Sequence, residues 1–149
     1  MWVITFLIIN FSALAIGSFL MNNGPTSNWY ITLNKAPWTP PGWVFGVAWT
    51  AIMICFSIYL TYLVDIKNNN IFWVLFAIQF ILNISWNFVF FNQHAIGFGL
   101  IVIILLTLII GYYLFNFKSD LGFKSLFIVP YFLWLLVATS LNAYSYLKN

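Results

Sequence analysis

The sequence predicts an all-α fold, an integral membrane protein folded as a bundle of five transmembrane helices. Of its 149 residues, 64% are hydrophobic and only 5% are charged, whereas about a quarter of the residues in a soluble domain are charged. Five apolar segments reach the ~20 residues that a helix needs to cross the bilayer core. Because these segments do not alternate between apolar and polar residues, as membrane-barrel strands do, we expect helices.

The five spans are expected at residues 2–21, 43–64, 71–91, 95–117 and 125–147, within one domain that covers 1–149. Three of the breaks are short turns, so neighbouring spans should be antiparallel, whereas the first break, 22–42, is much longer. The N-terminal segment lacks the basic region of a signal peptide and is interpreted as a retained first span.

The charged side chains all lie in or beside the breaks. They are five lysines and two aspartates, and this placement is typical of interfacial anchors, so the net charge of +3 does not indicate a nucleic-acid partner. The lysines divide too evenly between the two sides of the membrane to fix the orientation.

No Asp, Glu, Lys, Arg or His lies inside any predicted span. Pumps and proton-coupled carriers keep such residues in the membrane, so this pattern disfavours both classes. His94 falls in the third break and Met53 is alone in its span, which disfavours axial haem ligation. Cys55, the only cysteine, is expected to pack as a small hydrophobic residue. We therefore expect no metal site and no resident cofactor.

The first break ends in "KAPWTPPGWVFGVAW", residues 35–49, which holds three prolines and three tryptophans. Residues before proline avoid the helical conformation, so residues 22–42 are predicted to form a defined, partly extended lid over the mouth of the bundle. The second span should begin near Pro41 or Gly42, with Thr39 as a candidate cap. The lid residues are Trp29, Tyr30, Trp38 and Pro40. An interfacial aromatic belt accounts for most such rings, but Trp49 lies two turns into its span and needs a buried partner or a cavity.

Two of the spans carry polar and aromatic side chains at helical spacing. In the third span, one helical face carries Gln79, Asn83, Trp86, Asn87 and Phe90. These amides either join helices or form the polar floor of a ligand cavity, and both interpretations stay open. In the fifth span, the residues that share a face are Trp134, Ala138, Leu141, Asn142 and Ser145. Small residues on this face either allow close helix contact or leave room for a ligand.

The first span contains a small-xxx-small pair, Ala13 and Gly17. Such pairs mark close contacts between membrane helices, including contacts across a dimer. Together, these features predict an uncharged aromatic pocket beneath the lid, suited to a flat and largely apolar small molecule.

Three motifs, in order, resemble the TspO/MBR family, which contains the tryptophan-rich sensory proteins and the translocator protein (peripheral benzodiazepine receptor). They are "WYITLNKAPWTPPGWVFGVAW" (29–49), "LNISWNFVFF" (82–91) and "PYFLWLLVATSLN" (130–142). The resemblance covers nearly the whole chain. It implies five transmembrane helices, a homodimer, and binding of porphyrins such as protoporphyrin IX, or of sterol- or benzodiazepine-type ligands, beneath the first loop.

The resemblance also assigns site residues. The implied pocket residues are Trp49, Asn83, Asn87, Trp134, Ala138 and Thr139. Some bacterial members promote light-dependent porphyrin breakdown through two pocket tryptophans, so Trp49 and Trp134 are the candidate catalytic residues for such chemistry. The chain departs from the family at Val47 and Met53, where a proline and a tyrosine are usual. A lost kink and a lost hydroxyl could therefore change the ligand preference.

The expected function is a receptor or sensor for protoporphyrin IX in the bacterial cell membrane, with photodegradation as an added activity. The expected ligand-binding residues are Trp29, Tyr30, Trp38, Pro40, Trp49, Asn83, Trp86, Asn87, Trp134, Ala138, Thr139 and Asn142. Porphyrin propionates would lie near Lys35, since no basic group lies deeper. Two alternatives stay open: a transporter of tetrapyrrole or sterol-like molecules, and a ligand-biased regulatory partner of another membrane protein.

Overall fold

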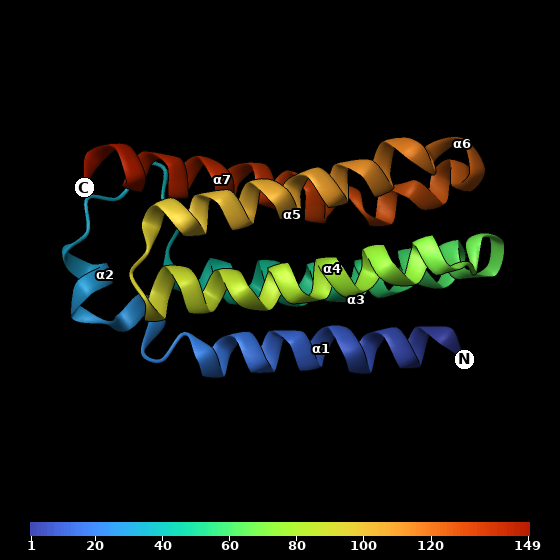
Figure 1. Cartoon of the computed structure of the whole chain (residues 1–149), viewed down its shortest axis with the longest axis horizontal. Helices are drawn as coiled ribbons and strands as arrows, with labels where there is room; N and C mark the ends of the chain where they lie inside the picture. The colour runs from blue at the N-terminus through green and yellow to red at the C-terminus, as the bar shows by residue number, and fades with distance from the viewer.

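The computed structural model describes residues 1–149 and contains helices but no strand, which confirms the all-α prediction. The long helices are α1 (Trp2–Leu20), α3 (Gly42–Lys67), α4 (Asn70–Asn87), α5 (Ile96–Asn116) and α7 (Val129–Lys148). They run side by side along the long axis of the molecule (Figure 1). The short elements are η1 (Gly24–Thr26), α2 (Asn28–Thr32), η2 (Phe88–Asn92), α6 (Lys118–Leu121) and η3 (Gly122–Phe127).

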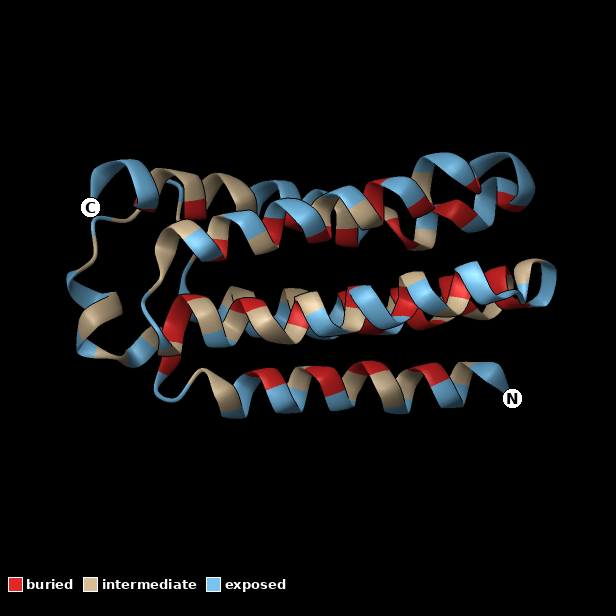
Figure 2. Ribbon diagram, in the orientation of Figure 1, coloured by how far each residue is buried: buried red, intermediate tan, exposed pale blue.

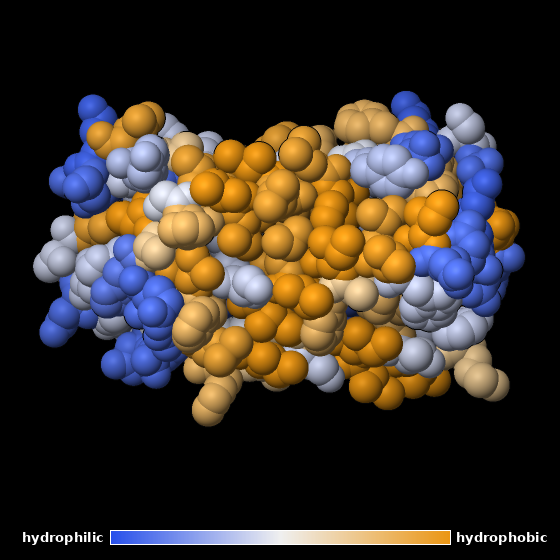
Figure 3. Space-filling model, viewed as in Figure 1, coloured by the Kyte–Doolittle hydropathy of each residue, from blue (hydrophilic) through white to orange (hydrophobic).

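Four of these helices are long and apolar enough to cross a membrane, namely α1, α3, α4 and α5. Helix α7 passes the same test only together with the segment Lys118–Phe127, from which it is bent by 73°. The fifth predicted span therefore begins later than expected, at Val129, with Pro130 in its first turn. Figure 3 shows a broad hydrophobic belt around the middle of the molecule and hydrophilic residues at both ends, as expected for a protein embedded in a bilayer.

The helices form two groups, α1 with α3 and α5 with α7, and α4 contacts both groups. Helix α1 packs against α3 and α4, α4 also packs against α5, and α5 packs along α7. In Figure 1, α1 lies at one edge of the bundle and α5 and α7 at the other. Buried positions face the interior of the bundle, and the outward faces are largely exposed (Figure 2). The first loop and the C-terminus lie at one end of the bundle, opposite the N-terminus and α6.

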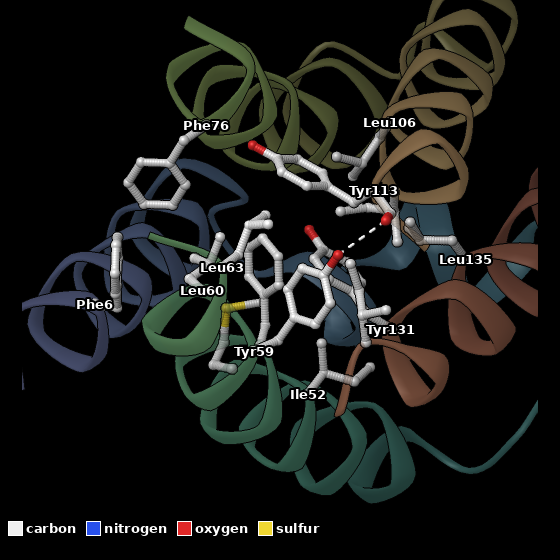
Figure 4. Close-up of a cluster of buried hydrophobic side chains, with 14 of the residues drawn as sticks. Phe6, Ile52, Tyr59, Leu60, Leu63, Phe76, Leu106, Tyr113, Tyr131 and Leu135 are labelled. Carbon is white, nitrogen blue, oxygen red and sulfur yellow. Dashed lines mark hydrogen bonds between the residues drawn. The ribbon is translucent and has the colours of Figure 1, made fainter. Parts of the chain in front are cut away.

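The core of the bundle is strongly aromatic (Figure 4). Phe56, Tyr59, Tyr113 and Tyr131 are fully buried. The ring of Phe56 meets the Tyr131 ring edge-on at 5.0 Å, and the Tyr59 hydroxyl donates to the carbonyl oxygen of Tyr113 at 2.9 Å. Membrane helices associate through close packing and hydrogen bonds rather than through the hydrophobic effect. These rings therefore provide both kinds of contact between α3, α5 and α7.

A buried polar contact joins α1 to α3. The Nδ2 atom of Asn10 donates to Ser57 Oγ at 2.8 Å, and Ser57 Oγ donates in turn to the carbonyl oxygen of Met53 at 2.7 Å. Both side chains are almost fully buried. In lipid, an amide at this position must find its partner within the protein.

The small pair on α1 is also buried within the chain. Ala13 is 4% exposed, and a Cβ atom added at Gly17 would lie 2.7 Å from Nδ2 of Asn87 on α4. Gly17 therefore makes its close contact with the chain's own α4, and Ala13 on the same helix is also buried within the chain.

Helix α3 begins at Gly42, as predicted, but its cap differs from expectation. Thr39 is not its cap, because Thr39 Oγ1 donates to the carbonyl oxygen of Ala36 at 2.7 Å. The N-cap residue is Pro41, without a side-chain hydrogen bond. The helix then runs unbroken through Val47 and Met53. Val47 is exposed and Met53 is buried in the core.

The Asn10–Ser57 contact predicts the effect of Ser57→Ala. This substitution removes the acceptor of a buried amide, so we expect the free energy of unfolding to fall by about 1 kcal/mol. Reversible unfolding in mixed detergent micelles measures the change. Ser12→Ala is the matched control, because Ser12 also donates to the carbonyl four residues earlier, at Ile8, but is exposed. Equal effects of the two substitutions would contradict the assignment.

Candidate functional site

The first loop, residues 22–42, contains two short helices followed by an extended segment. Ser27 caps α2 by accepting a hydrogen bond from the Tyr30 backbone N–H at 3.3 Å. At the other end of α2, Lys35 Nζ donates to the carbonyl oxygens of Tyr30, at 2.9 Å, and Ile31, at 3.2 Å. The loop is therefore more helical than the prolines alone predicted, because η1 and α2 precede the proline-rich segment.

Side-chain contacts tie the first loop to the bundle. Trp38 Nε1 donates to Ser140 Oγ on α7 at 3.1 Å, and its ring meets that of Tyr144 at 5.5 Å. On the other side, the Trp29 ring stacks on His94 at 4.2 Å, with the ring planes 10° apart. These contacts hold the loop across the end of the bundle, where Figure 1 shows α2.

A cavity of about 310 Å³ lies between α1, α3 and α4 at this end. We call it the main cavity because Trp49 and the α4 amides line it. Its lining residues are Leu14, Ser18, Met21, Pro25, Gly42, Phe45, Gly46, Trp49, Thr50, Asn83, Trp86, Asn87 and Phe91. Four of the predicted ligand residues thus face one space: Trp49, Asn83, Trp86 and Asn87. Exposed Ser18, Gly46 and Thr50 form part of the lining, so the cavity opens sideways between α1 and α3.

A second space of about 630 Å³ lies under the first loop itself. Tyr30, Lys35 and Pro40 line it, and it shares Pro25, Gly42 and Phe45 with the main cavity. A much smaller space, about 30 Å³, adjoins Trp86 and Ala138. Burial raises the pKa of Tyr30 above its ordinary value, so its hydroxyl stays protonated and neutral at physiological pH.

Two amides on α4 are held by Tyr131 of α7. Gln79 Nε2 and Asn83 Nδ2 donate to the Tyr131 hydroxyl oxygen at 2.7 and 3.1 Å. The carbonyl oxygen of Gln79 is buried without a partner, and rotating this amide would let the Tyr131 hydroxyl donate to it. Gln79 thus acts as a link between helices. Asn83 shares that role but also lines the cavity.

Trp86 and Asn142 form a second link between α4 and α7. The indole N–H of Trp86 donates to Oδ1 of Asn142 at 3.0 Å, and Asn142 Nδ2 donates to the carbonyl oxygen of Ile96 at 2.9 Å. Asn142 is 2% exposed and lines none of the spaces described above. Its role in the structure is to orient Trp86 and fix the start of α5.

The two candidate catalytic tryptophans face different spaces. Trp49 lines the main cavity and meets the Tyr131 ring edge-on at 5.9 Å. Trp134 lines a separate groove of about 270 Å³ between α3 and α7, and its indole nitrogen is buried without a hydrogen-bond partner. The ring of Phe45 lies 5.5 Å from that of Trp134 and also lines the main cavity, so Phe45 separates the two spaces.

Thr139 also lies away from the cavity. Its hydroxyl shares a hydrogen bond of 3.2 Å with that of Thr107, across the α5–α7 interface. Of the implied Ala–Thr pair, only Ala138 borders a space at this end of the bundle.

Sequence reasoning missed Phe45 and Phe91 as lining residues. Phe45 precedes Trp49 by four residues, so helical spacing could have identified it. Phe91 could not be found in this way, because it belongs to η2, a π-helical turn that changes the register after Trp86. In the same turn, the Phe90 ring stacks on Trp86 at 5.2 Å.

Comparison with known proteins identifies the family and relatives of the chain. Residues 4–147 match the TspO/MBR family. The chain is 37% identical over 122 residues to the tryptophan-rich protein TspO of Chlorobaculum tepidum, covering 79% of this chain and 77% of that protein. It is 35% identical over 118 residues to protein CrtK of Rhodobacter capsulatus, covering 76% and 74%. It is 29% identical over 132 residues to the human translocator protein, covering 80% and 74%.

The contacts of Trp38 predict that Trp38→Phe loosens the first loop. The substitution keeps an aromatic ring but removes the donor to Ser140, so amide hydrogen exchange in residues 33–41 should accelerate several-fold. Trp43→Phe is the matched control, because the Trp43 side chain is 71% exposed. Unchanged exchange in Trp38→Phe would show that this hydrogen bond does not hold the loop.

Proposed function

The chain belongs to the TspO/MBR family of membrane proteins, and from this premise we propose that it is a membrane receptor for protoporphyrin IX. The observation that carries the proposal is the main cavity between α1, α3 and α4. Its lining residues include Trp49, Trp86, Asn83 and Asn87. Indole faces suit a flat apolar ring, and a few fixed amides orient it.

Hydrogen-bonding capacity in the cavity matches a porphyrin. The side-chain oxygens of Asn83 and Asn87 accept no hydrogen bond within the protein, whereas their nitrogens are both used as donors. These oxygens would accept from the pyrrole N–H groups. Lys35 uses two of its three donors on backbone carbonyls. The third would reach a propionate in the space under the first loop.

The size of the cavity sets where the macrocycle would lie. A volume of about 310 Å³ is at the lower end for ligand pockets, so the main cavity alone would not enclose the ring. The adjoining space of about 630 Å³ would take the remainder. Sterol- or benzodiazepine-type ligands would use the same region.

Light-dependent degradation is the second part of the proposal. A bound porphyrin absorbs light itself, and dissolved dioxygen serves as the oxidant. The protein would contribute position, by holding the ring against the oxidisable indole of Trp49. Trp134 would contact the same porphyrin only if the Phe45 side chain changed its rotamer. The Phe45 ring separates the space of Trp134 from the main cavity, which Trp49 lines.

The proposal includes two features of architecture. Helix α7, joined to the bent segment before it, would serve as the fifth span. The homodimer that the family resemblance implies would use a surface other than Ala13 and Gly17, because both residues face the inside of the chain.

A titration with protoporphyrin IX in the dark tests the binding site. We expect saturable quenching of tryptophan fluorescence in the purified protein, and a three- to tenfold weaker affinity, roughly, in Trp49→Phe. Trp43→Phe is the control, because this exposed tryptophan lines none of the described cavities. Trp134→Phe should weaken binding less than Trp49→Phe. Quenching that does not saturate, or that is equal in all four proteins, would contradict the proposal.

Illumination of the same samples tests the degradation step. The porphyrin absorption should decay faster with wild-type protein than with Trp49→Phe at equal porphyrin occupancy, and removal of dioxygen should stop the decay. Equal decay in both proteins would leave the protein as a receptor only.

A further inference from the structure

A second pocket lies at the opposite end of the bundle from the first loop. It has a volume of about 500 Å³ and is formed where α5 ends, α6 and η3 turn back, and α7 begins. No residue of the proposed porphyrin site lines it. The proposal made here is therefore independent of the proposed function.

The turn that shapes this pocket depends on Gly122. Its φ of 56° and ψ of −127° lie in a backbone region that is essentially restricted to glycine. The turn reverses the chain between α6 and η3, and it brings Ser125 and Leu126 beside the end of α5. The backbone conformation at Gly122 therefore determines the shape of the pocket, which does not result from loose packing of side chains.

The pocket holds one buried polar group that the protein does not satisfy. Ser125 is 5% exposed, and its Oγ atom has no hydrogen-bond partner. A buried hydroxyl without a partner costs free energy that a ligand's acceptor would recover. Ser125 lines the pocket, so a ligand there could supply the acceptor.

The same pocket carries a cation and apolar walls. Lys118 lines it and takes part in no ion pair, whereas neighbouring Asp120 is paired with Lys67 at 3.6 Å. The Lys124 ammonium group lies over the Tyr62 ring, 4.4 Å from its centre. Lys118 is therefore the free charge at the pocket.

The apolar side of the pocket faces outward. Its walls include Phe115, 67% exposed, and Leu126, 63% exposed. Exposed apolar side chains at the end of a membrane-spanning helix such as α5 can pack against acyl chains. A group bound here would therefore have a polar head at Lys118 and Ser125 and a hydrocarbon tail along α5 and α7.

We propose that this pocket is a specific site for one anionic phospholipid of the surrounding bilayer. The phosphate accepts hydrogen bonds from the Lys118 ammonium group and the Ser125 hydroxyl, and one acyl chain lies against Phe115 and Leu126. Basic pockets between transmembrane helices recognise lipid headgroups in this way. The bound lipid would also stabilise the bent junction between η3 and α7.

Native mass spectrometry of the delipidated full-length protein tests this site. Palmitoyl-oleoyl-phosphatidylglycerol is the probe, added to the protein in detergent micelles. We expect one retained lipid in the wild type, and about tenfold weaker retention in Lys118→Gln and in Ser125→Ala, because each loses a hydrogen bond to the phosphate. Diacylglycerol with the same chains should be retained far less than phosphatidylglycerol, since it lacks the phosphate.

Two matched controls isolate the pocket. Lys148→Gln removes a lysine at the other end of the bundle, and Ser119→Ala removes an exposed hydroxyl beside the pocket. Both should retain the lipid as the wild type does. Retention that is equal in all the variants, or equal for phosphatidylglycerol and diacylglycerol, would overturn the proposal. Thermal unfolding of each variant in lipid-free micelles shows that a change in retention does not come from loss of fold.

Discussion

The structure depends on the need to pair buried amides inside a bilayer. Water is absent from the hydrocarbon core, so Gln79 and Asn83 of α4 must find their partners on another helix. Both find the Tyr131 hydroxyl on α7, and Trp86 finds Asn142 on the same helix. These contacts fix the rotation of α4 and its height relative to α7. Every side chain on that face of α4 is placed as a result.

The candidate site follows from this constraint. With α4 fixed by its contacts to α7, Asn87 turns towards α1, where Gly17 leaves room for its amide. Trp86 and the π-helical turn after it bring Phe91 under the first loop. The space left between α1, α3 and α4 is therefore lined by groups whose positions are already determined. A rigid cavity of this kind binds a flat ligand with little loss of side-chain entropy.

Hydropathy was enough to predict most of the fold. The apolar runs identified the five long helices, because lipid requires long continuous helices, and the observed ends differ from the predicted ones by only a few residues. Four of these helices are long and apolar enough to cross a membrane by themselves. The short helices in the first loop were not predictable, since α2 depends on Ser27 at one end and Lys35 at the other. The turn at Gly122 between α6 and η3, and the bend between η3 and α7, were not predictable either, because hydropathy carries no information about local backbone turns.

The site was predicted in part. Spacing on one helix correctly grouped Asn83, Trp86 and Asn87, because a single helix fixes which side chains share a face. Spacing could not show how two helices cross. Trp49 and Trp134 lie on different helices, and only the structure shows that they line separate spaces, with the Phe45 ring of α3 against Trp134. Thr139 was assigned by resemblance, and its bond to Thr107 could not be read from one chain segment.

The most direct test of the account fills the cavity without disturbing the fold. Gly46 lines the cavity, and a Cβ atom added there would meet nothing within 4 Å. Gly46→Leu should therefore fold as well as the wild type, since leucine also favours the helix, yet its side chain would occupy the ligand's space. Val47→Leu, on an exposed part of α3, is the control.

The measurement is the affinity for protoporphyrin IX in the dark, together with the thermal midpoint of unfolding. We expect Gly46→Leu to bind at least about tenfold more weakly, at an unchanged or higher midpoint, because filling the cavity removes the ring's contact surface. Wild-type affinity in a folded Gly46→Leu protein would show that the ligand does not bind between α1, α3 and α4.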